Sequence, residues 1–209
     1  MTLFRLRRIP ITVMVGALLP LQACALSSEP IEGKVLEEGT NRPITGAMVV
    51  VRWVGRTTST LSGLYVESRD MCYHVETALT DTEGSYRTSA WKQEQQKNYS
   101  LKFDHFSVDA YKPSYGIPTA PSQKREVFLL KPFTGTREER LRAVWSSGVQ
   151  CGSAGESRKN LIPLYRALHE EAMSLAQSQE GKKIVNALQN ELEKLESGND
   201  ATKRILQKQ

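Results

Sequence analysis

The segment Gly46-Ala-Met-Val-Val-Val-Arg-Trp-Val54 carries the strongest strand pattern in this chain of 209 residues. Its side chains alternate with a period of two, so one face of an extended strand would present Ala47, Val49, Val51 and Trp53. A turn-forming segment, residues 38–43, comes just before it. This pattern predicts a strand packed against a hydrophobic core.

Further short runs of the same alternation surround this segment and are separated by turn residues. Between two of them lies Asp81-Thr82-Glu83-Gly84, where Gly84 would supply the positive φ of a tight hairpin. Counted with residues 46–54, seven short strands are expected in about 100 residues, which favours a β-sandwich. The other six cover residues 31–35, 72–80, 85–90, 99–103, 106–110 and 127–130.

The C-terminal part changes to a helical period. Thr136 followed by Glu139 predicts a capping box at the start of a short helix. Two longer helices are expected over residues 160–178, with Pro163 in the first turn, and over residues 180–196. Their apolar stripes favour packing against each other and the sandwich, although a partner helix would use the same stripes. The predicted class is α+β, with a sandwich over 31–132, helices over 133–196 and a disordered tail over 197–209.

Three segments of the expected sandwich resemble one known family. Residues 31–35 (IEGKV), 42–49 (RPITGAMV) and 80–86 (TDTEGSY) are similar to the carboxypeptidase regulatory-like domain. This resemblance implies a seven-stranded transthyretin-like β-sandwich. It also implies a binding or structural module that has no catalytic residues of its own.

The N-terminus has the features of a secretion signal. Arg5, Arg7 and Arg8 precede an apolar stretch, Ile9–Leu21, which as a helix would rise only about 20 Å and is too short to cross a bilayer. The net charge of +5 falls to 25 − 23 = +2 without residues 1–23, which hold three arginines and no acid. The remaining charge gives little reason to expect a nucleic-acid partner.

Leu21-Gln22-Ala23-Cys24 resembles the lipobox of bacterial lipoproteins, although Gln22 departs from the small residue usual there. The resemblance implies that residues 1–23 are removed, that Cys24 carries lipid, and that residues 24–30 form a lipidated tether. The same resemblance implies a place at the outer membrane, facing the periplasm, rather than at the inner membrane, because Ala25 and not Asp follows the cysteine. The alternative is cleavage nearby, which would leave Cys24 as a free thiol.

Two cysteines remain once Cys24 is assigned to lipid. An exported chain lies in an oxidising compartment, so Cys72 and Cys151 are expected to form a disulfide. Free thiols or a metal site are the alternatives, but two thiolates need further ligands, and Cys72-Tyr73-His74 is not a standard ligand spacing.

Three tyrosines are candidate ligand contacts. Tyr65 lies within the polar segment Gly55–Met71, which would be either a recognition loop or a hairpin insertion. Tyr111 and Tyr115 lie in a Pro/Gly-rich segment that ends at Pro118. Aromatic rings on loops suit sugars or peptides, but they also cover the ends of sandwiches.

Little in the sequence points to catalysis. The three histidines lie far apart, and the chain has no HExxH motif, nucleophile elbow or glycine-rich phosphate loop. Asp104, His105 and Ser107 form the one weak hint of a hydrolase. No cofactor or metal is expected. We therefore expect a non-enzymatic envelope lipoprotein that binds another envelope protein; a cell-wall or carbohydrate binder is the first alternative, and a hydrolase using His105 the second.

Overall fold

The computed structural model describes residues 25–61, 65–94, 100–116, 127–152 and 154–198. Within these ranges, the side chains of residues 25, 57–61, 65–69, 94 and 100–102 are not described. The expected signal segment 1–23, Cys24 and nearly all of the expected tail therefore lie outside the described residues. So does Pro118.

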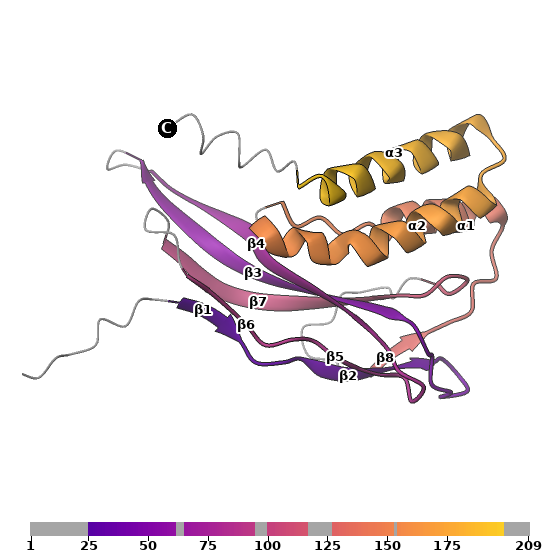
Figure 1. The fold of residues 1–209 in the computed structure, drawn as a ribbon, viewed down its shortest axis with the longest axis horizontal. Coiled ribbons are helices and arrows are strands. Elements are labelled where there is room, and N and C mark those ends of the chain that lie inside the picture. The colour runs from indigo at the N-terminus through magenta and orange to yellow at the C-terminus, as the bar shows by residue number, and fades with distance from the viewer. Residues whose placement is uncertain (1–24, 62–64, 95–99, 117–126, 153, 199–209) are drawn as a thin grey trace, which may run out of the picture.

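The central sheet has the order β4-β3-β7, formed by β3 (Met48–Leu61), β4 (Tyr65–Leu79) and β7 (Ser100–Tyr111), and all its pairs are antiparallel. It lies between the helices and the other strands (Figure 1). Both faces of β3 are therefore covered, which explains the unbroken apolar run Met48–Val51. Val49, Val51 and Trp53 point to one side as predicted, and Met48 and Val50 point to the other.

A second three-stranded sheet packs on one face of the central sheet. It has the order β5-β2-β8, with β2 (Glu32–Glu37) antiparallel to β5 (Ser85–Arg87) and parallel to β8 (Val127–Leu130). The two sheets share a set of buried side chains that we call the inner core. It comprises Val35, Ile44, Ala47, Val49, Val51, Trp53, Tyr73, Tyr86, Val108, Ala110, Phe128 and Leu130.

A third sheet is a two-stranded ribbon of β1 (Ala25–Ser28) and β6 (Trp91–Glu94). Neither strand was expected, because both are short and the first lies within the predicted tether. The described residues thus form eight strands in three sheets, and the prediction of seven strands is wrong. The prediction of an α+β protein is confirmed.

Two β-bulges explain part of the difference between the strands expected from the sequence and those in the structure. The partner of β3 shifts from His105 to Phe103 between Val54 and Gly55, so Asp104 is an extra residue in β7. This extra residue reverses the alternation, which is why one continuous strand gave the pattern of two. A second bulge places Tyr73 as the extra residue in β4.

The described parts of the segment Gly55–Met71, residues 55–61 and 65–71, are paired strands rather than a loop. Their residues continue β3 and β4 in register from Gly55↔Met71 to Leu61↔Tyr65. Serine and threonine are compatible with strands, so their polar character had concealed an extension of the central sheet.

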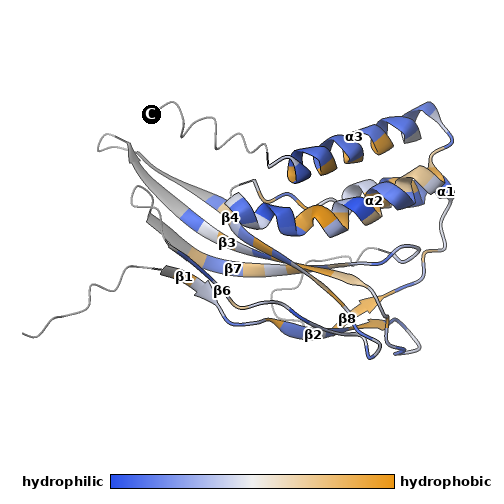
Figure 2. Ribbon diagram, viewed as in Figure 1, coloured by the Kyte–Doolittle hydropathy of each residue, from blue (hydrophilic) through white to orange (hydrophobic). Residues whose placement is uncertain are grey.

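In the part of the chain that the structure describes, three α-helices and one short 3₁₀ helix lie on the other side of the central sheet (Figure 1). They are α1 (Arg137–Ser146), η1 (Gly155–Leu161), α2 (Ile162–Leu175) and α3 (Gln179–Glu196), with α3 packed on α2. The capping box of Thr136 and Glu139 is present. Figure 2 shows α3 as largely hydrophilic, with hydrophobic residues at intervals along it. Among the described residues, no helix is long and apolar enough to span a bilayer.

The apolar stripes of these helices pack inward, as favoured from the sequence. Met48, Val50, Val75 and Tyr111 of the sheet join a second core, which we call the helix core. The helical members are Leu141, Val144, Leu161, Leu164, Tyr165, Leu168, Ala172, Leu188, Leu192 and Leu195.

The segments that carry the family resemblance interlock around one turn. Thr80 Oγ1 donates to the carbonyl of Ile44 at 2.6 Å and accepts from the Ala47 amide at 2.8 Å. Gly84 has φ +71°, as predicted, and its amide donates to Asp81 at 3.1 Å. Val35 in turn donates to the Gly84 carbonyl at 2.8 Å. These bonds join the two sheets at the end where β3 begins.

Candidate functional site

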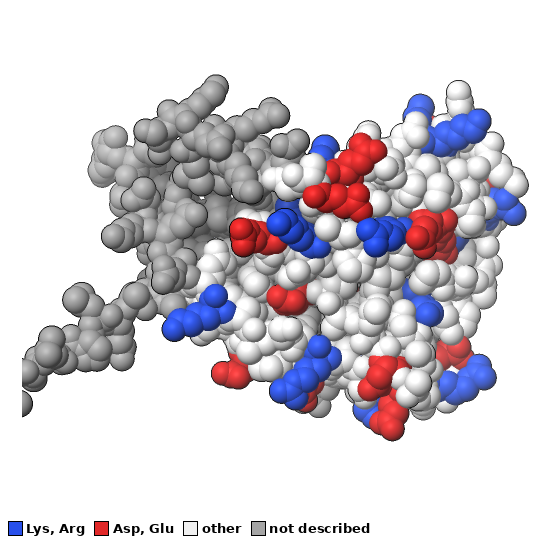
Figure 3. Space-filling model, viewed as in Figure 1, with Lys and Arg blue, Asp and Glu red and all other residues white. Residues whose placement is uncertain are grey.

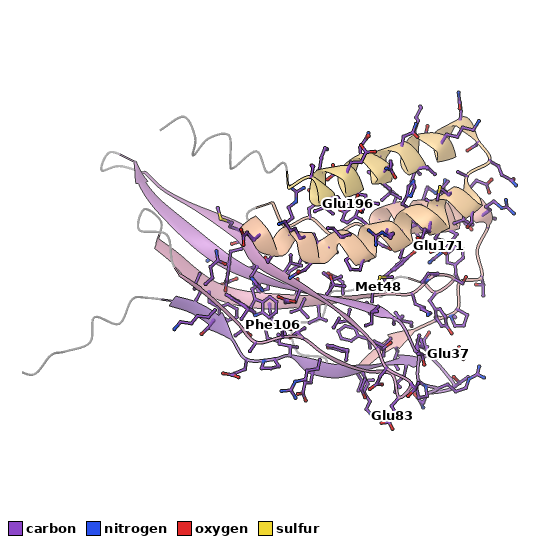
Figure 4. All side chains as sticks on the ribbon, in the orientation of Figure 1. Glu37, Met48, Glu83, Phe106, Glu171 and Glu196 are labelled. Carbon is purple, nitrogen blue, oxygen red and sulfur yellow. A yellow bond between two sulfur atoms is a disulfide. The ribbon has the colours of Figure 1, made fainter. Side chains whose placement is uncertain are left out.

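A buried ion pair lies where the helices meet the end of β7. Arg140 of α1 donates from Nε to Glu171 Oε1 and from Nη2 to Glu171 Oε2, both at 2.8 Å. Arg140 also donates to the carbonyls of Tyr115 and Lys112. Tyr111 donates its hydroxyl to Glu171, and the Ser114 amide donates to the same carboxylate at 3.0 Å. We call these residues the junction cluster; Figure 4 labels Glu171 at this position.

The electrostatics of the junction cluster indicate a structural role. Burial alone would raise the pKa of Glu171, but the hydrogen bonds from Arg140, Tyr111 and Ser114 outweigh it and lower the pKa. Burial, followed by the bond to Glu171, raises the pKa of Tyr111. The carboxylate therefore stays ionised and fully bonded, with no free lone pair aimed at a cavity. Tyr111 is only 5% exposed, so its ring presents no face to a ligand.

Tyr115 forms a hydrogen bond next to the junction cluster, to Glu37. Its hydroxyl donates to Glu37 Oε2 at 2.9 Å, while Arg42 and Thr40 bond Glu37 Oε1 at 2.9 and 2.8 Å. Hydrogen bonds from Arg42, then from Thr40 and Tyr115, lower the pKa of Glu37 to about 2. The ring of Tyr115 packs against the inner core. Tyr115 thus closes one end of the two sheets. The third candidate, Tyr65, is the first residue of β4, and its side chain lies outside the described set.

The three residues of the hydrolase hypothesis are only partly brought together. His105 Nδ1 lies 2.7 Å from Asp104 Oδ2, and this bond lowers the pKa of Asp104. Ser107 Oγ is buried and has no hydrogen-bond partner among the described residues. A serine nucleophile needs a bond to its base. The contact between Ser107 and His105 that this requires is not formed.

An aromatic cluster that the sequence did not reveal surrounds His74. Its ring stacks on Trp91 at 4.0 Å between centroids and meets the edge of Trp53 at 5.3 Å. Burial lowers the pKa of His74 to about 4 and raises that of Glu76, whose Oε1 lies 3.1 Å from His74 Nε2. The bulge at Tyr73 and the pairing of β6 create this cluster, and neither follows from the spacing of the residues. Its main effect is to hold β6 to the central sheet.

The predicted disulfide between Cys72 and Cys151 is present, with its Cα atoms 5.0 Å apart. It joins the edge strand β4 to the segment just before η1, and two hydrogen bonds join β4 to η1 itself. The Val75 amide donates to Ser157 Oγ at 3.2 Å, and Asn160 Nδ2 donates to the Val75 carbonyl at 3.0 Å. Side chains of η1 thus occupy backbone groups that an edge strand would otherwise present to another chain.

Between the central sheet and the helices lies a small cavity of about 120 Å³, lined in part by Arg52, Asp109 and Leu164. Ligand pockets usually measure about 300–1,000 Å³. This cavity is too small to be the candidate site.

The outer face of the β5-β2-β8 sheet offers a larger accessible surface. Phe128 and Leu130 point into the inner core, so Val127 and Leu129 point outward, where they are 42% and 47% exposed. Leu129 pairs with half-buried Leu36. We call Leu36, Val127 and Leu129 the outer strip. Four consecutive apolar residues at 127–130 were the sequence signal for it, and Figure 2 shows β8 as hydrophobic.

An open groove adjoins the outer strip. It has a volume of about 780 Å³, and its lining includes Val127 and Leu79, which is 61% exposed. Its charged members carry both signs: Glu32, Lys34, Asp81 and Arg87. Apolar side chains bordered by mixed charges are typical of surfaces that bind proteins. On the face seen in Figure 3, acidic and basic residues are likewise interspersed.

No group of three His, Cys, Asp or Glu side chains within the described ranges is arranged to hold a metal ion. The chain matches no family model, and it is similar to no curated protein and to no solved structure.

Proposed function

We propose that this chain is a non-enzymatic lipoprotein of the bacterial envelope that binds another envelope protein through the outer strip. The support for export comes from two independent features. Residues 1–23 have the pattern of a secretion signal that ends at a lipobox, and Cys72 and Cys151 are paired, as is usual in an oxidising compartment. Ala25 after the lipidated cysteine favours the periplasmic side of the outer membrane.

The observation that carries the proposed binding role is the exposure of the outer strip. Val127 and Leu129 leave about half of their surface to solvent, on a sheet whose other face is fully packed. Leu79 is also exposed and lines the same groove as Val127. Contiguous exposed apolar side chains with a charged border are a common mark of a protein-binding surface.

The family resemblance fits the same proposal. We propose that the two facing sheets derive from a transthyretin-like sandwich of the carboxypeptidase regulatory-like kind, with the ribbon and helices as additions. The interlocked turn around Thr80 and Gly84 supports this, because it uses the segments that resemble the family. Such a scaffold would act by binding rather than by chemistry.

Support for the glycan alternative is weaker. Of the three tyrosines that suggested it, Tyr111 belongs to the junction cluster and Tyr115 packs against the inner core, while the side chain of Tyr65 lies outside the described set. A carbohydrate site generally needs an aromatic face open to solvent.

The test is photo-cross-linking in living cells. A photoreactive amino acid replaces Leu129 in one variant and Met173 in another, because Met173 of α2 is a matched apolar position that is 53% exposed. We expect one dominant protein adduct from position 129 and none from position 173. The adduct should disappear when Val127→Lys is added. This change should alter the free energy of unfolding by no more than about 0.5 kcal/mol, because the side chain points outward.

Three outcomes would count against the proposal. Equal labelling from both positions would mean that the outer strip is not a specific surface. An adduct with cell-wall glycan from position 129 would favour the carbohydrate alternative. No adduct from position 129, in cells where the protein is correctly located, would remove the basis of the proposed binding role.

A further inference from the structure

The first described strand begins at the residue after the proposed lipid site. Strand β1 starts at Ala25, which pairs with Glu94, and the ladder continues through Leu26, Ser27 and Ser28 to Trp91. Since consecutive Cα atoms are about 3.8 Å apart, a lipid on Cys24 would be joined to the sheet by a single peptide link. The sequence alone favoured a tether over residues 24–30, which would have left the body free to turn.

The ribbon of β1 and β6 is held firmly to the rest of the molecule. Leu26 and Trp91 pack against the inner core. Trp91 also meets Trp53 edge to face, with ring centroids 5.4 Å apart, and stacks on His74. Just beyond β1, the Ile31 amide donates to Thr88 Oγ1 at 2.8 Å, and the Thr88 amide donates back to the Ile31 carbonyl at 2.9 Å. The first strand therefore cannot swing away without disrupting buried aromatic contacts.

The start of β1 lies at one end of an elongated body. The described ends of β3, β4 and β7 lie at the same end, as Figure 1 shows. Glu83 and Glu37 are labelled near the opposite end in Figure 4. The 14 residues of β3 extend between these ends and would measure about 45 Å along the strand.

We propose that the lipid fixes the orientation of this protein on the membrane, with the end at which β1 and β7 begin facing the bilayer. This inference rests on the proposed lipid anchor at Cys24. Strand β2 runs away from that end, and β8 runs parallel to it. The outer strip is then held away from the lipid, on the side from which a protein in the periplasm approaches. The bilayer and the proposed partner would thus contact different ends of one rigid body.

Fluorescence quenching in vesicles tests this orientation. The full protein is produced in cells, purified from membranes and reconstituted into phosphatidylethanolamine and phosphatidylglycerol vesicles with spin-labelled headgroups. A fluorescent amino acid replaces either Phe103, which is 53% exposed and three residues from the start of β7, or Glu83 in the turn at the far end. We expect quenching several-fold stronger at position 103 than at position 83.

A linker variant shows whether the short link is the cause. Inserting about 20 Gly/Ser residues between Cys24 and Ala25 would add a reach of about 25 Å and should reduce the difference between the two positions. The same insert added after Gln209 is the control and should leave the difference unchanged. Both insertions leave β1 intact, so a circular dichroism spectrum like that of the unmodified protein is the required check of folding.

The intact mass of the purified protein separates the two possible failures. A mass without acyl groups on Cys24 would overturn the lipid anchor of the proposed function, and this inference with it. Acylated protein with equal quenching at positions 103 and 83 would overturn the fixed orientation alone. A difference that survives the linker insertion would mean that a surface of the body, rather than the short link, orients the protein.

Discussion

The guanidinium of Arg140 in α1 and the carboxylate of Glu171 in α2 face each other edge to edge, with two nitrogen–oxygen contacts of 2.8 Å. The same guanidinium donates to the carbonyls of Lys112 and Tyr115 just after β7. One side chain thereby ties two helices to the central sheet. Such a bidentate pair fixes orientation as well as distance.

Removing Arg140 should destabilise the protein strongly, because Glu171 would be left charged and buried. We expect Arg140→Ala to cost about 3–5 kcal/mol in the free energy of unfolding, or about 10 °C in Tm by thermal circular dichroism. Arg166→Ala is the matched control, since Arg166 pairs with Glu196 at 2.9 Å while 56% exposed. It should cost less than about 1 kcal/mol. Equal losses in the two variants would contradict a structural role for the junction cluster.

Gly84 should not tolerate a side chain. A Cβ there would lie 2.5 Å from the Val35 carbonyl oxygen, and its φ of +71° is already unfavourable for other residues. We expect Gly84→Ala to lower the free energy of unfolding by about 3 kcal/mol or more. Gly39→Ala provides the comparison: φ is +84°, but nothing lies within 4 Å, so only the backbone cost of about 1 kcal/mol applies. Urea denaturation of both variants measures the difference, and similar midpoints would argue against a steric cause.

Loss of the disulfide should loosen η1 from β4. The bridge joins residues 79 apart in the sequence, for which the chain-entropy model gives about 4 kcal/mol. We expect Cys151→Ser to lower the urea midpoint accordingly and to speed hydrogen exchange at the Val75 amide, which Ser157 covers. Unchanged exchange at Val75 in Cys151→Ser would mean that Ser157 and Asn160 hold η1 without help.

Stability should fall on mild acidification because of His74. Its pKa is lowered from 6.5 to about 4 by burial, so the unfolded chain binds a proton more readily than the folded protein. The contribution is complete above pH 6.5 and is lost as the pH falls toward 4, by up to about 3 kcal/mol. Urea unfolding across this range measures it. In a His74→Phe/Glu76→Gln variant, which keeps the aromatic stack, this part of the pH dependence should be absent.

Glu37 provides a contrast in a different pH window. Its pKa is lowered from 4.5 to about 2, chiefly by Arg42, so its contribution is present above pH 4.5 and is lost between there and pH 2. Glu37→Gln should therefore change the pH dependence only below pH 4.5. If Glu37→Gln instead changed the pH dependence of stability near pH 6, the titrations of Glu37 and His74 would have to be coupled.

Local patterns predicted much of the fold. The face of β3 with Val49, Val51 and Trp53, the capping box of Thr136, the hairpin glycine and the helical stripes all follow from short-range periodicity and backbone preference. Each of these features depends on residues a few positions apart, and such spacings can be read directly from the sequence. The cysteine count likewise led to the disulfide, because only one pair remained once Cys24 was assigned to lipid.

Features that combine distant segments were not predictable. Asp104 is a bulge only because β3 pairs with β7, and β1 and β6 are strands only because they pair with each other. Tyr111 and Tyr115 looked like ligand contacts because nothing near them in sequence indicates Glu171 or Glu37, to which their hydroxyls donate. Val127 and Leu129 are exposed because every residue of β8 is apolar and only every second one, Phe128 and Leu130, points into the inner core.

The sequence by itself determined the mixed class of this protein, the alternation of its main strand, the capped start of α1 and its single cysteine pair, because these depend on local chemistry or on counting. The tertiary structure alone decided which polar side chains are satisfied, which apolar ones stay exposed, and how closely the first strand follows Cys24. Those properties depend on contacts between residues far apart in the sequence, such as Val75 and Asn160, which are 85 positions apart, and such distant contacts leave no periodic trace in the chain.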